Sequence, residues 1–209
     1  MNTTPQNERN ENRSANPLLM SRDDTALLVI DMQQKLLPHI WHHKRVEWNV
    51  CRLLQAAITL GIPVGATEQY PQGLGQTIPE IIQWMGNASV PAKLAFSAAV
   101  CHEVLERFAN NQRRKVLLCG IEAHVCVLQT ALDMVQDGFE VFVSVDAVGS
   151  RFVTDYDFAL RRMEASGVTL VTTEMTMFEW CGAAGSPEFK QISQLARQIA
   201  PDDSTTPYR

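Results

Sequence analysis

Short apolar runs alternate with segments of helical periodicity along most of this chain, and this alternation constrains the fold more than any other feature. The apolar runs predict strands over residues 25–30, 63–67, 115–119, 140–145 and 168–172. The intervening and following segments predict helices over residues 47–60, 98–109, 123–136, 154–166 and 189–199. Repeated β–α units imply a parallel sheet with helices on both faces.

Length and composition fit a single domain. The chain has 209 residues, of which 45% are hydrophobic and 20% charged. A chain of this size can bury a core without disulfides. We expect one domain over residues 21–200, with the polar residues 1–20 as a disordered tail and residues 201–209 as a flexible C-terminus.

Charge, hydropathy and cysteine usage argue against several classes of protein. The net charge of -5 gives no electrostatic support for binding nucleic acid or an anionic membrane. No apolar run reaches the roughly 18–20 residues of a membrane span, and the polar N-terminus does not resemble a signal peptide. The 5 cysteines form no CxxC pair and are interpreted as free thiols. These features predict a cytoplasmic location.

Three candidate reactive residues lie where the predicted strands end. Asp31 follows the first strand, and Cys126 lies just past the strand over residues 115–119, where a helix begins. Lys93 stands in an apolar loop segment, where a lysine is unusual. Ligands of parallel sheets bind at the carboxyl ends of the strands. The free N–H groups and the dipole at a helix start also predict a lowered pKa for the Cys126 thiol.

An aspartate, a lysine and a cysteine that meet in one site have a defined chemistry. A nearby ammonium favours the thiolate, and a carboxylate can accept the thiol proton. The thiolate can then attack an electrophilic carbon. Backbone N–H groups at the start of the helix that carries Cys126 can stabilise the resulting oxyanion.

Four motifs in order carry a resemblance to a known family. They are LLVIDMQ at residues 27–33, TEQYP at 67–71, KLAFS at 93–97 and GIEAHVCV at 120–127. Together they resemble the isochorismatase-like cysteine hydrolase superfamily over residues 24–195. The resemblance implies a Rossmann-like three-layer α/β/α sandwich around a six-stranded, mainly parallel sheet. It also implies that Asp31 is the general base, that Lys93 stabilises the thiolate and the intermediate, and that Cys126 is the nucleophile.

The same resemblance implies three further properties. A non-proline cis peptide would join Ile121 and Glu122 and turn the Glu122 N–H toward the oxyanion. The backbone N–H groups of Glu122 and Cys126 would form the oxyanion hole. The chain would also associate as a homodimer or a larger homo-oligomer.

One departure from the superfamily concerns metal. Nicotinamidases in it carry an Asp-x-His metal motif after the second strand, where this chain has Glu68-Gln69-Tyr70. No two histidines are spaced as a metal site, so we expect no metal and no other cofactor. The string TEQYP-x-GLG instead resembles the uncharacterised isochorismatase domain-containing subgroup.

Five other residues are candidates for the substrate pocket, and each has an alternative role. Glu68 and Gln69 line the pocket or hydrogen-bond behind it. Tyr70 and Phe96 form its walls or pack in the core. His124 contacts substrate or serves as a structural hydrogen-bonding histidine. We interpret Asp146 and Arg151 as a structural ion pair and not as catalytic residues.

The predicted function is metal-independent hydrolysis of a small molecule, at a C–N bond of amide type and through a thioester on Cys126. An alternative is a redox- or electrophile-sensing protein, or an interaction protein, that uses the same activated thiol. Nucleotide binding is disfavoured because no Gly-x-Gly-x-x-Gly follows a strand. The aromatic segment over residues 175–180 suits an interface as well as a core.

Overall fold

A six-stranded parallel sheet forms the centre of the protein, with the strand order β3-β2-β1-β4-β5-β6. The computed structural model describes residues 16–86 and 88–202. The strands are β1 (Thr25–Ile30), β2 (Val64–Gln69), β3 (Ala92–Lys93), β4 (Lys115–Ile121), β5 (Glu140–Gly149) and β6 (Thr169–Val171). All residues of β1 and β4 are buried, as expected for central strands covered on both faces.

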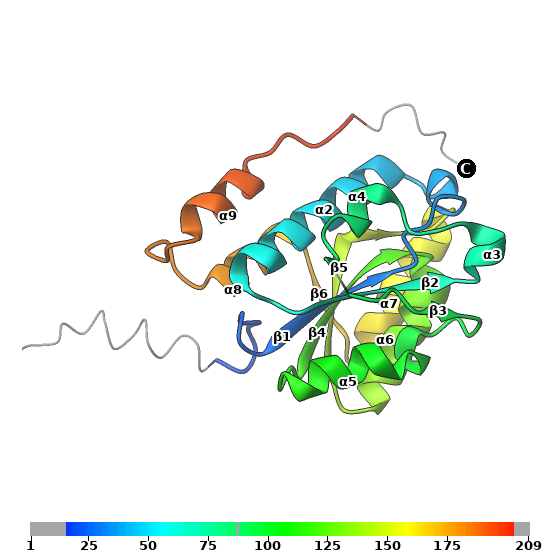
Figure 1. Cartoon of the computed structure of the whole chain (residues 1–209), viewed down its shortest axis with the longest axis horizontal. Helices are drawn as coiled ribbons and strands as arrows, with labels where there is room; N and C mark the ends of the chain where they lie inside the picture. The colour runs from blue at the N-terminus through cyan, green and yellow to red at the C-terminus, as the bar shows by residue number, and fades with distance from the viewer. Residues whose placement is uncertain (1–15, 87, 203–209) are drawn as a thin grey trace, which may run out of the picture.

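Helices cover both faces of the sheet and confirm the three-layer α/β/α fold (Figure 1). One face carries α2 (His43–Leu60), α8 (Thr173–Cys181) and α9 (Phe189–Ala196). The other carries α5 (His102–Asn110), α6 (Leu128–Gln136) and α7 (Val153–Ala165). The short elements are α3 (Pro71–Leu74), α4 (Pro79–Ile82), the 3-10 turns η2 (Leu37–His39) and η3 (Ala98–Val100), and the π-helix η4 (Ala123–Val127).

The structure differs from the sequence prediction at Lys93 and in two of the predicted helices. Lys93 belongs to the two-residue strand β3 and not to a loop. The helix predicted over residues 98–109 is a 3-10 turn followed by α5, and the helix predicted over residues 123–136 begins as a π-helix. The segment over residues 175–180 belongs to a helix, α8, which buries Trp180 and exposes Phe178.

The N-terminal approach to β1 is anchored by buried contacts. Met20 is buried, and its N–H donates to Glu179 at 2.9 Å. The Lys115 ammonium donates to Leu19 O at 2.6 Å and to Asp24 Oδ2 at 2.9 Å. Most of the tail predicted over residues 1–20, and residues 203–209 of the predicted flexible C-terminus, lie outside the described residues. Within the described residues, every helix is too short or too polar to cross a membrane.

Gly120 permits a close approach between β4 and β1 near the carboxyl ends of these strands. Its φ is +120°, and a Cβ at this position would lie 2.1 Å from the Ile30 carbonyl oxygen. We expect Gly120→Ala to lower the free energy of unfolding by about 2–5 kcal/mol, because left-handed strain and overpacking add. Urea denaturation measures this change. Gly185→Ala is the matched control, since its Cβ meets no atom within 4 Å; equal losses in both variants would contradict the prediction.

Candidate active site

Three reactive side chains meet at the carboxyl edge of the sheet. Asp31 directly follows β1, Lys93 ends β3, and Cys126 lies on η4 just beyond β4. The Lys93 ammonium lies 2.7 Å from Asp31 Oδ2, and both side chains are 0% exposed. The Asp31 carboxylate and the Lys93 ammonium both act on the pKa of Cys126, so its thiol lies near this ion pair. The structure therefore brings together the three residues that the sequence predicted as catalytic.

Asp31 is held by its backbone and by neighbouring polar groups. It has a left-handed φ of 53°, and the Thr67 hydroxyl donates to Asp31 Oδ1 at 2.9 Å. Burial raises the pKa of Asp31, and the opposing effects of Lys93, Cys126 and Thr67 do not cancel it. A buried carboxylate with a raised pKa is a stronger base than an exposed aspartate.

Lys93 is fixed by three acceptors. Besides Asp31, its ammonium donates to Gln69 Oε1 and to the Phe96 carbonyl oxygen, each at 2.9 Å. A lysine ammonium carries three donors, so every one of them has a partner. The positive charge is therefore held in one position beside Asp31 and Cys126.

The helix that carries Cys126 begins with a π turn. The Val127 N–H donates to the Glu122 carbonyl oxygen at 3.2 Å, five residues back along the chain. The Thr130 hydroxyl donates to the Cys126 carbonyl oxygen at 2.6 Å and accepts from the Ala98 N–H at 2.8 Å. Thr130 thus links the helix that carries Cys126 to the segment that follows Lys93. Single π turns within helices occur frequently at functional sites.

The Cys126 thiol is buried, with 3% of the residue exposed. Burial raises its pKa above the ordinary thiol value, and the Asp31 charge raises it further, whereas Lys93 lowers it. The predicted lowering of this pKa by the helix start is therefore wrong for the resting protein. Desolvation and a neighbouring carboxylate outweigh the helix dipole, so Cys126 rests as a thiol.

The turn before η4 also differs from the expectation. Within the described residues there is no cis peptide bond, so the predicted cis bond between Ile121 and Glu122 is wrong. Glu122 instead adopts a left-handed conformation, with φ 58° and ψ 61°, and reverses the chain with a trans bond. This turn places the start of η4 beside the end of β4.

His124 lies in a polar cluster beside this turn. Its Nδ1 is 3.0 Å from Ser150 Oγ and 3.5 Å from Glu122 Oε2, and its Nε2 is 3.8 Å from Asp155 Oδ2. These contacts engage both ring nitrogens with the protein. Arg151 Nε lies 3.0 Å from Glu122 Oε1.

Asp146 makes different contacts from those predicted. It accepts hydrogen bonds from Thr173, from the backbone N–H at 2.8 Å and from the hydroxyl at 3.0 Å. It also accepts from the Ser144 hydroxyl at 3.0 Å. The ion partner that the structure gives Arg151 is Glu122, so the interpretation of Asp146 and Arg151 as a pair is wrong.

The other predicted pocket residues divide into two groups. Glu68 Oε1 is turned inward and accepts from the Thr77 N–H at 2.6 Å and from its hydroxyl at 2.7 Å. Gln69 holds Lys93 and also donates to the Leu94 carbonyl oxygen. Tyr70 and Phe96 are about half exposed at the same edge. Glu68 and Gln69 therefore organise the site from behind, whereas the two aromatic residues face solvent.

Three residues of the site were not predicted. Thr67 and Thr130 each orient a catalytic candidate, but threonine is also ordinary within a strand or a helix. Gln33 is fully buried; it donates to the Gly75 carbonyl oxygen at 2.6 Å and accepts from the Gln69 N–H at 2.8 Å. The sequence feature that could have identified Gln33 is its position two residues after Asp31, in the segment that leaves the sheet.

The described residues contain no cluster of three or more histidine, cysteine, aspartate or glutamate side chains arranged to hold a metal ion. At the position of the Asp-x-His motif, Glu68 and Gln69 are committed to protein hydrogen bonds. Tyr70 offers a phenol in place of an imidazole. The donor set at this position thus does not fit the metal motif of the nicotinamidases.

Comparison with known proteins agrees with this fold. The model of the isochorismatase domain matches residues 25–175. The chain therefore belongs to the isochorismatase family.

Relatives of known sequence and structure cover most of the chain. Isochorismatase domain-containing protein 2 of Homo sapiens is 41% identical over 85% of this chain and 85% of its own. Its Danio rerio counterpart is 40% identical over 88% of this chain and 92% of its own. The structure described as MAR1 ribonuclease from Caenorhabditis elegans superposes with a TM-score of 0.82 and 37% identity, covering 91% of this chain and 98% of its own.

Proposed function

We propose that this protein is a metal-independent cysteine hydrolase of a small molecule, with Asp31, Lys93 and Cys126 as its catalytic triad. One observation carries the proposal: Asp31 and Lys93 form a fully buried ion pair at 2.7 Å, and the charges of both residues act on the Cys126 thiol. A buried ion pair beside a thiol is costly to maintain for structure alone. Membership of a family that typically comprises hydrolases supports this interpretation.

The reaction starts from the neutral thiol. Asp31 accepts the Sγ proton as the sulfur of Cys126 attacks the carbonyl carbon of an amide-type bond. The carbonyl oxygen becomes an oxyanion, stabilised by the backbone N–H groups of Glu122 and Cys126. The intermediate collapses and the C–N bond breaks. The amine leaves with the proton that Asp31 held, and the acyl group remains on Cys126 as a thioester. Water then attacks the thioester carbon while Asp31 takes one of its protons. The C–S bond breaks, Asp31 returns the proton to Sγ, and the acid and the free thiol are released.

Lys93 has an electrostatic role in this sequence. Its charge stabilises the Asp31 carboxylate before proton transfer and the thiolate during attack, which offsets the burial of both groups. The raised pKa of Cys126 means that proton transfer and attack are coupled, since little thiolate exists at rest.

The alternative function, redox or electrophile sensing, requires a thiol that is exposed and ionised near neutral pH. We expect instead that iodoacetamide alkylation of Cys126 rises about tenfold per pH unit through pH 9 without a plateau, because burial and Asp31 raise the pKa of the thiol. Peptide mass spectrometry follows the Cys126 peptide, with glutathione as the reference thiol. A plateau below pH 7 would favour the sensor and overturn the coupled mechanism.

A substrate panel tests the hydrolase proposal. Amides, carbamates and N-carbamoyl compounds are incubated with the wild type and with Cys126→Ser, before and after dialysis against a chelator, and amine release is measured. We expect turnover of at least one class by the wild type, unchanged after chelation. An RNA oligonucleotide belongs in the panel because of the name given to the Caenorhabditis elegans protein. RNA cleavage that survives Cys126→Ser, without amide turnover, would refute the proposal.

Self-association is part of the same proposal. Tyr70, Phe96 and Phe152 are each about half exposed, and all three belong to loops that follow strands at the catalytic edge. Aromatic side chains of this kind are enriched at interfaces. We infer that copies of the chain associate through this edge as a homodimer or a larger assembly, and that the protein acts in the cytoplasm on a small molecule.

A further inference from the structure

The register of β4 and β5 places Arg151 beside the turn that precedes Cys126. Ile121, the last residue of β4, pairs with Gly149, the last residue of β5. Both segments then leave the sheet at its carboxyl edge, so Glu122 and Arg151 come together. The Arg151 Nε lies 3.0 Å from Glu122 Oε1. This ion pair therefore connects the ends of two neighbouring strands at the candidate active site.

Glu122 depends on such a contact because its backbone is strained. Its φ of 58° and ψ of 61° are left-handed. This conformation is unfavourable for any residue with a side chain and persists only where the surroundings enforce it. In the proposed mechanism the N–H of Glu122 binds the oxyanion, so the direction of this N–H depends on the turn. A contact that holds the Glu122 side chain also restricts the backbone that carries the N–H.

The carboxylate of Glu122 is also an unfavourable neighbour for the nucleophile. Its side chain is 8% exposed, and within the described part of the chain Oε2 accepts no hydrogen bond. Burial raises the pKa of the Cys126 thiol most, and the charges of Asp31 and Glu122 raise it further. A negative charge near the sulfur opposes the thiolate that forms during attack. A positive charge held against Glu122 offsets this effect.

Arg151 is better suited than His124 to supply that positive charge. The His124 Nδ1 is 3.5 Å from Glu122 Oε2 but only 3.0 Å from Ser150 Oγ, and its Nε2 is 3.8 Å from Asp155 Oδ2. The imidazole is therefore shared among several partners. A guanidinium stays protonated at every pH at which proteins fold, so the charge of Arg151 is permanent.

We propose that Arg151 is a positioning residue of the active site. Through its ion pair with Glu122 it fixes the turn that presents the oxyanion-hole N–H groups, and it offsets the Glu122 charge near the Cys126 sulfur. This inference rests on the proposed function, because the oxyanion and the attacking sulfur belong to the proposed hydrolysis. Arg151 itself takes no part in proton transfer or in attack.

Alkylation of Cys126 tests the electrostatic part without any substrate. The wild type, Arg151→Met and Arg151→Lys react with iodoacetamide at pH 8, and mass spectrometry follows the Cys126 peptide. We expect Arg151→Met to react about threefold to tenfold more slowly, because the Glu122 charge then opposes the thiolate without its partner. Arg151→Lys keeps the positive charge and should react within about twofold of the wild type.

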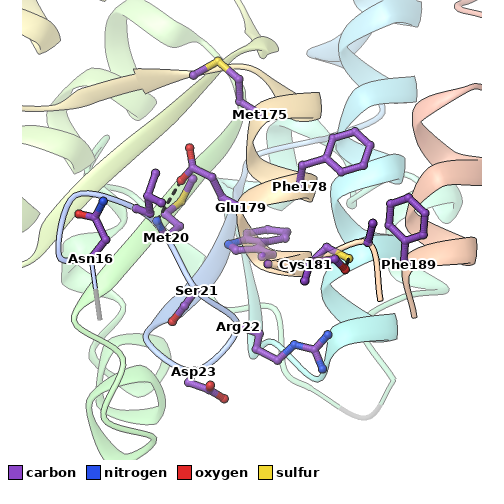
Figure 2. A pocket seen from close by; sticks show the side chains of 15 residues that line it. Asn16, Met20, Ser21, Arg22, Asp23, Met175, Phe178, Glu179, Cys181 and Phe189 are labelled. Carbon is purple, nitrogen blue, oxygen red and sulfur yellow. Dashed lines mark hydrogen bonds between the residues drawn. The ribbon is translucent and has the colours of Figure 1, made fainter. Parts of the chain in front are cut away.

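Arg22→Met is the matched control. Arg22 also forms an ion pair with a glutamate, Nη2 lying 3.0 Å from Glu188 Oε2, but it belongs to the segment before β1 (Figure 2). This segment leads into the amino end of β1, whereas Asp31 follows the carboxyl end, and a strand of this length spans roughly 20 Å. Loss of Arg22 should therefore change the alkylation of Cys126 and the rate of hydrolysis by less than about twofold.

Glu122→Gln shows whether Arg151 acts through Glu122. By itself this substitution removes the opposing charge and should speed alkylation of Cys126 by about threefold or more. Arg151→Met in the Glu122→Gln background should then alter the rate by less than about twofold, since the charge that Arg151 offsets is gone. An equal effect of Arg151→Met in both backgrounds would overturn the proposal.

Hydrolysis tests the oxyanion part. With the best substrate of the panel, Arg151→Met should lower kcat by about 10–100-fold and leave KM nearly unchanged, because a misplaced oxyanion donor weakens binding of the transition state and not of the substrate. Arg151→Lys should recover most of the lost kcat. A rise in KM at unchanged kcat would make Arg151 a substrate contact and contradict the positioning role.

This inference and the hydrolase proposal fail in different ways. If the wild type turns over no substrate, the hydrolase proposal fails, and the alkylation rates alone decide the role of the ion pair. If the wild type hydrolyses a substrate and Arg151→Met matches Arg22→Met in both assays, the inference about Arg151 is wrong and the hydrolase proposal stands. Arg151→Gln replaces Arg151→Met if that variant does not fold.

Discussion

Replacement of Cys126 by serine is expected to lower kcat/KM by about 10³-fold or more on any substrate that the wild type hydrolyses. A serine hydroxyl has the same shape as the thiol, but it is a much weaker nucleophile when its only base is a carboxylate. The loss should appear in kcat, because the residue acts on the reacting carbon and not on ground-state binding. Steady-state kinetics with the best substrate of the panel measures it.

Cys101 provides the matched control for this experiment. It is also buried, and its pKa responds to the charges of both Lys93 and Asp31, so it lies in the same electrostatic environment. Cys101→Ser should retain activity within a fewfold of the wild type. Activity that survives Cys126→Ser but falls with Cys101→Ser would identify Cys101 as the nucleophile and contradict the proposal.

Lys93→Met is expected to have the second large effect, on both stability and activity. The substitution keeps the length of the side chain but leaves the Asp31 carboxylate buried without its ion partner at 2.7 Å. Removal of one partner of a buried pair costs about 3–5 kcal/mol of the free energy of unfolding. Hydrolysis should fall by about 10³-fold, because no charge stabilises the thiolate.

The stability loss in Lys93→Met should depend on pH in a defined direction. Without Lys93, the pKa of Asp31 rises above its already raised value, because burial then acts without its main opposing charge. A group with a raised pKa in the folded state contributes stability below its unfolded pKa and loses it as pH rises through the folded pKa. The deficit against the wild type should therefore shrink as pH falls from 8 to 5, as measured by urea denaturation.

Two further variants separate charge from packing. Asp31→Asn combined with Lys93→Met removes both charges and should recover part of the stability but none of the activity. Lys115→Met removes the other buried lysine, whose partner Asp24 is partly exposed, and should cost less stability and leave hydrolysis intact. If Lys93→Met is as stable and as active as Lys115→Met, the proposed role of the Asp31–Lys93 ion pair is contradicted.

Much of the fold could be predicted because the strands of its centre are buried on both faces. Residues 25–30 and 115–119 appear as continuous apolar runs for this reason, and the structure places strands there. The strand β3 could not be predicted, since it has two residues, one of them exposed, and depends on pairing with β2. The π turn of η4 could not be predicted either, because it differs from an α-helix only in its hydrogen-bond register.

The residues of the candidate site also divide into those that the sequence could identify and those that it could not. Asp31 and Cys126 could be found because polar residues at the ends of apolar strands are visible in the sequence. Thr67 and Thr130 could not, since their hydroxyls act through contacts between segments distant in the chain. The direction of the pKa shift of Cys126 was predicted wrongly, because the sequence reveals a helix start but not the depth of burial or the distance to a carboxylate.

Acid-quenched peptide mass spectrometry tests the central claim most directly. The full chain is mixed with an activated aryl ester or anilide of the best acyl group, so that acylation outruns hydrolysis, and is digested after the quench. A mass increase equal to the acyl group on the peptide that contains Cys126, reversed by hydroxylamine, is the predicted result. Turnover without an adduct, or an adduct confined to another cysteine, would contradict the assignment of Cys126 as the nucleophile.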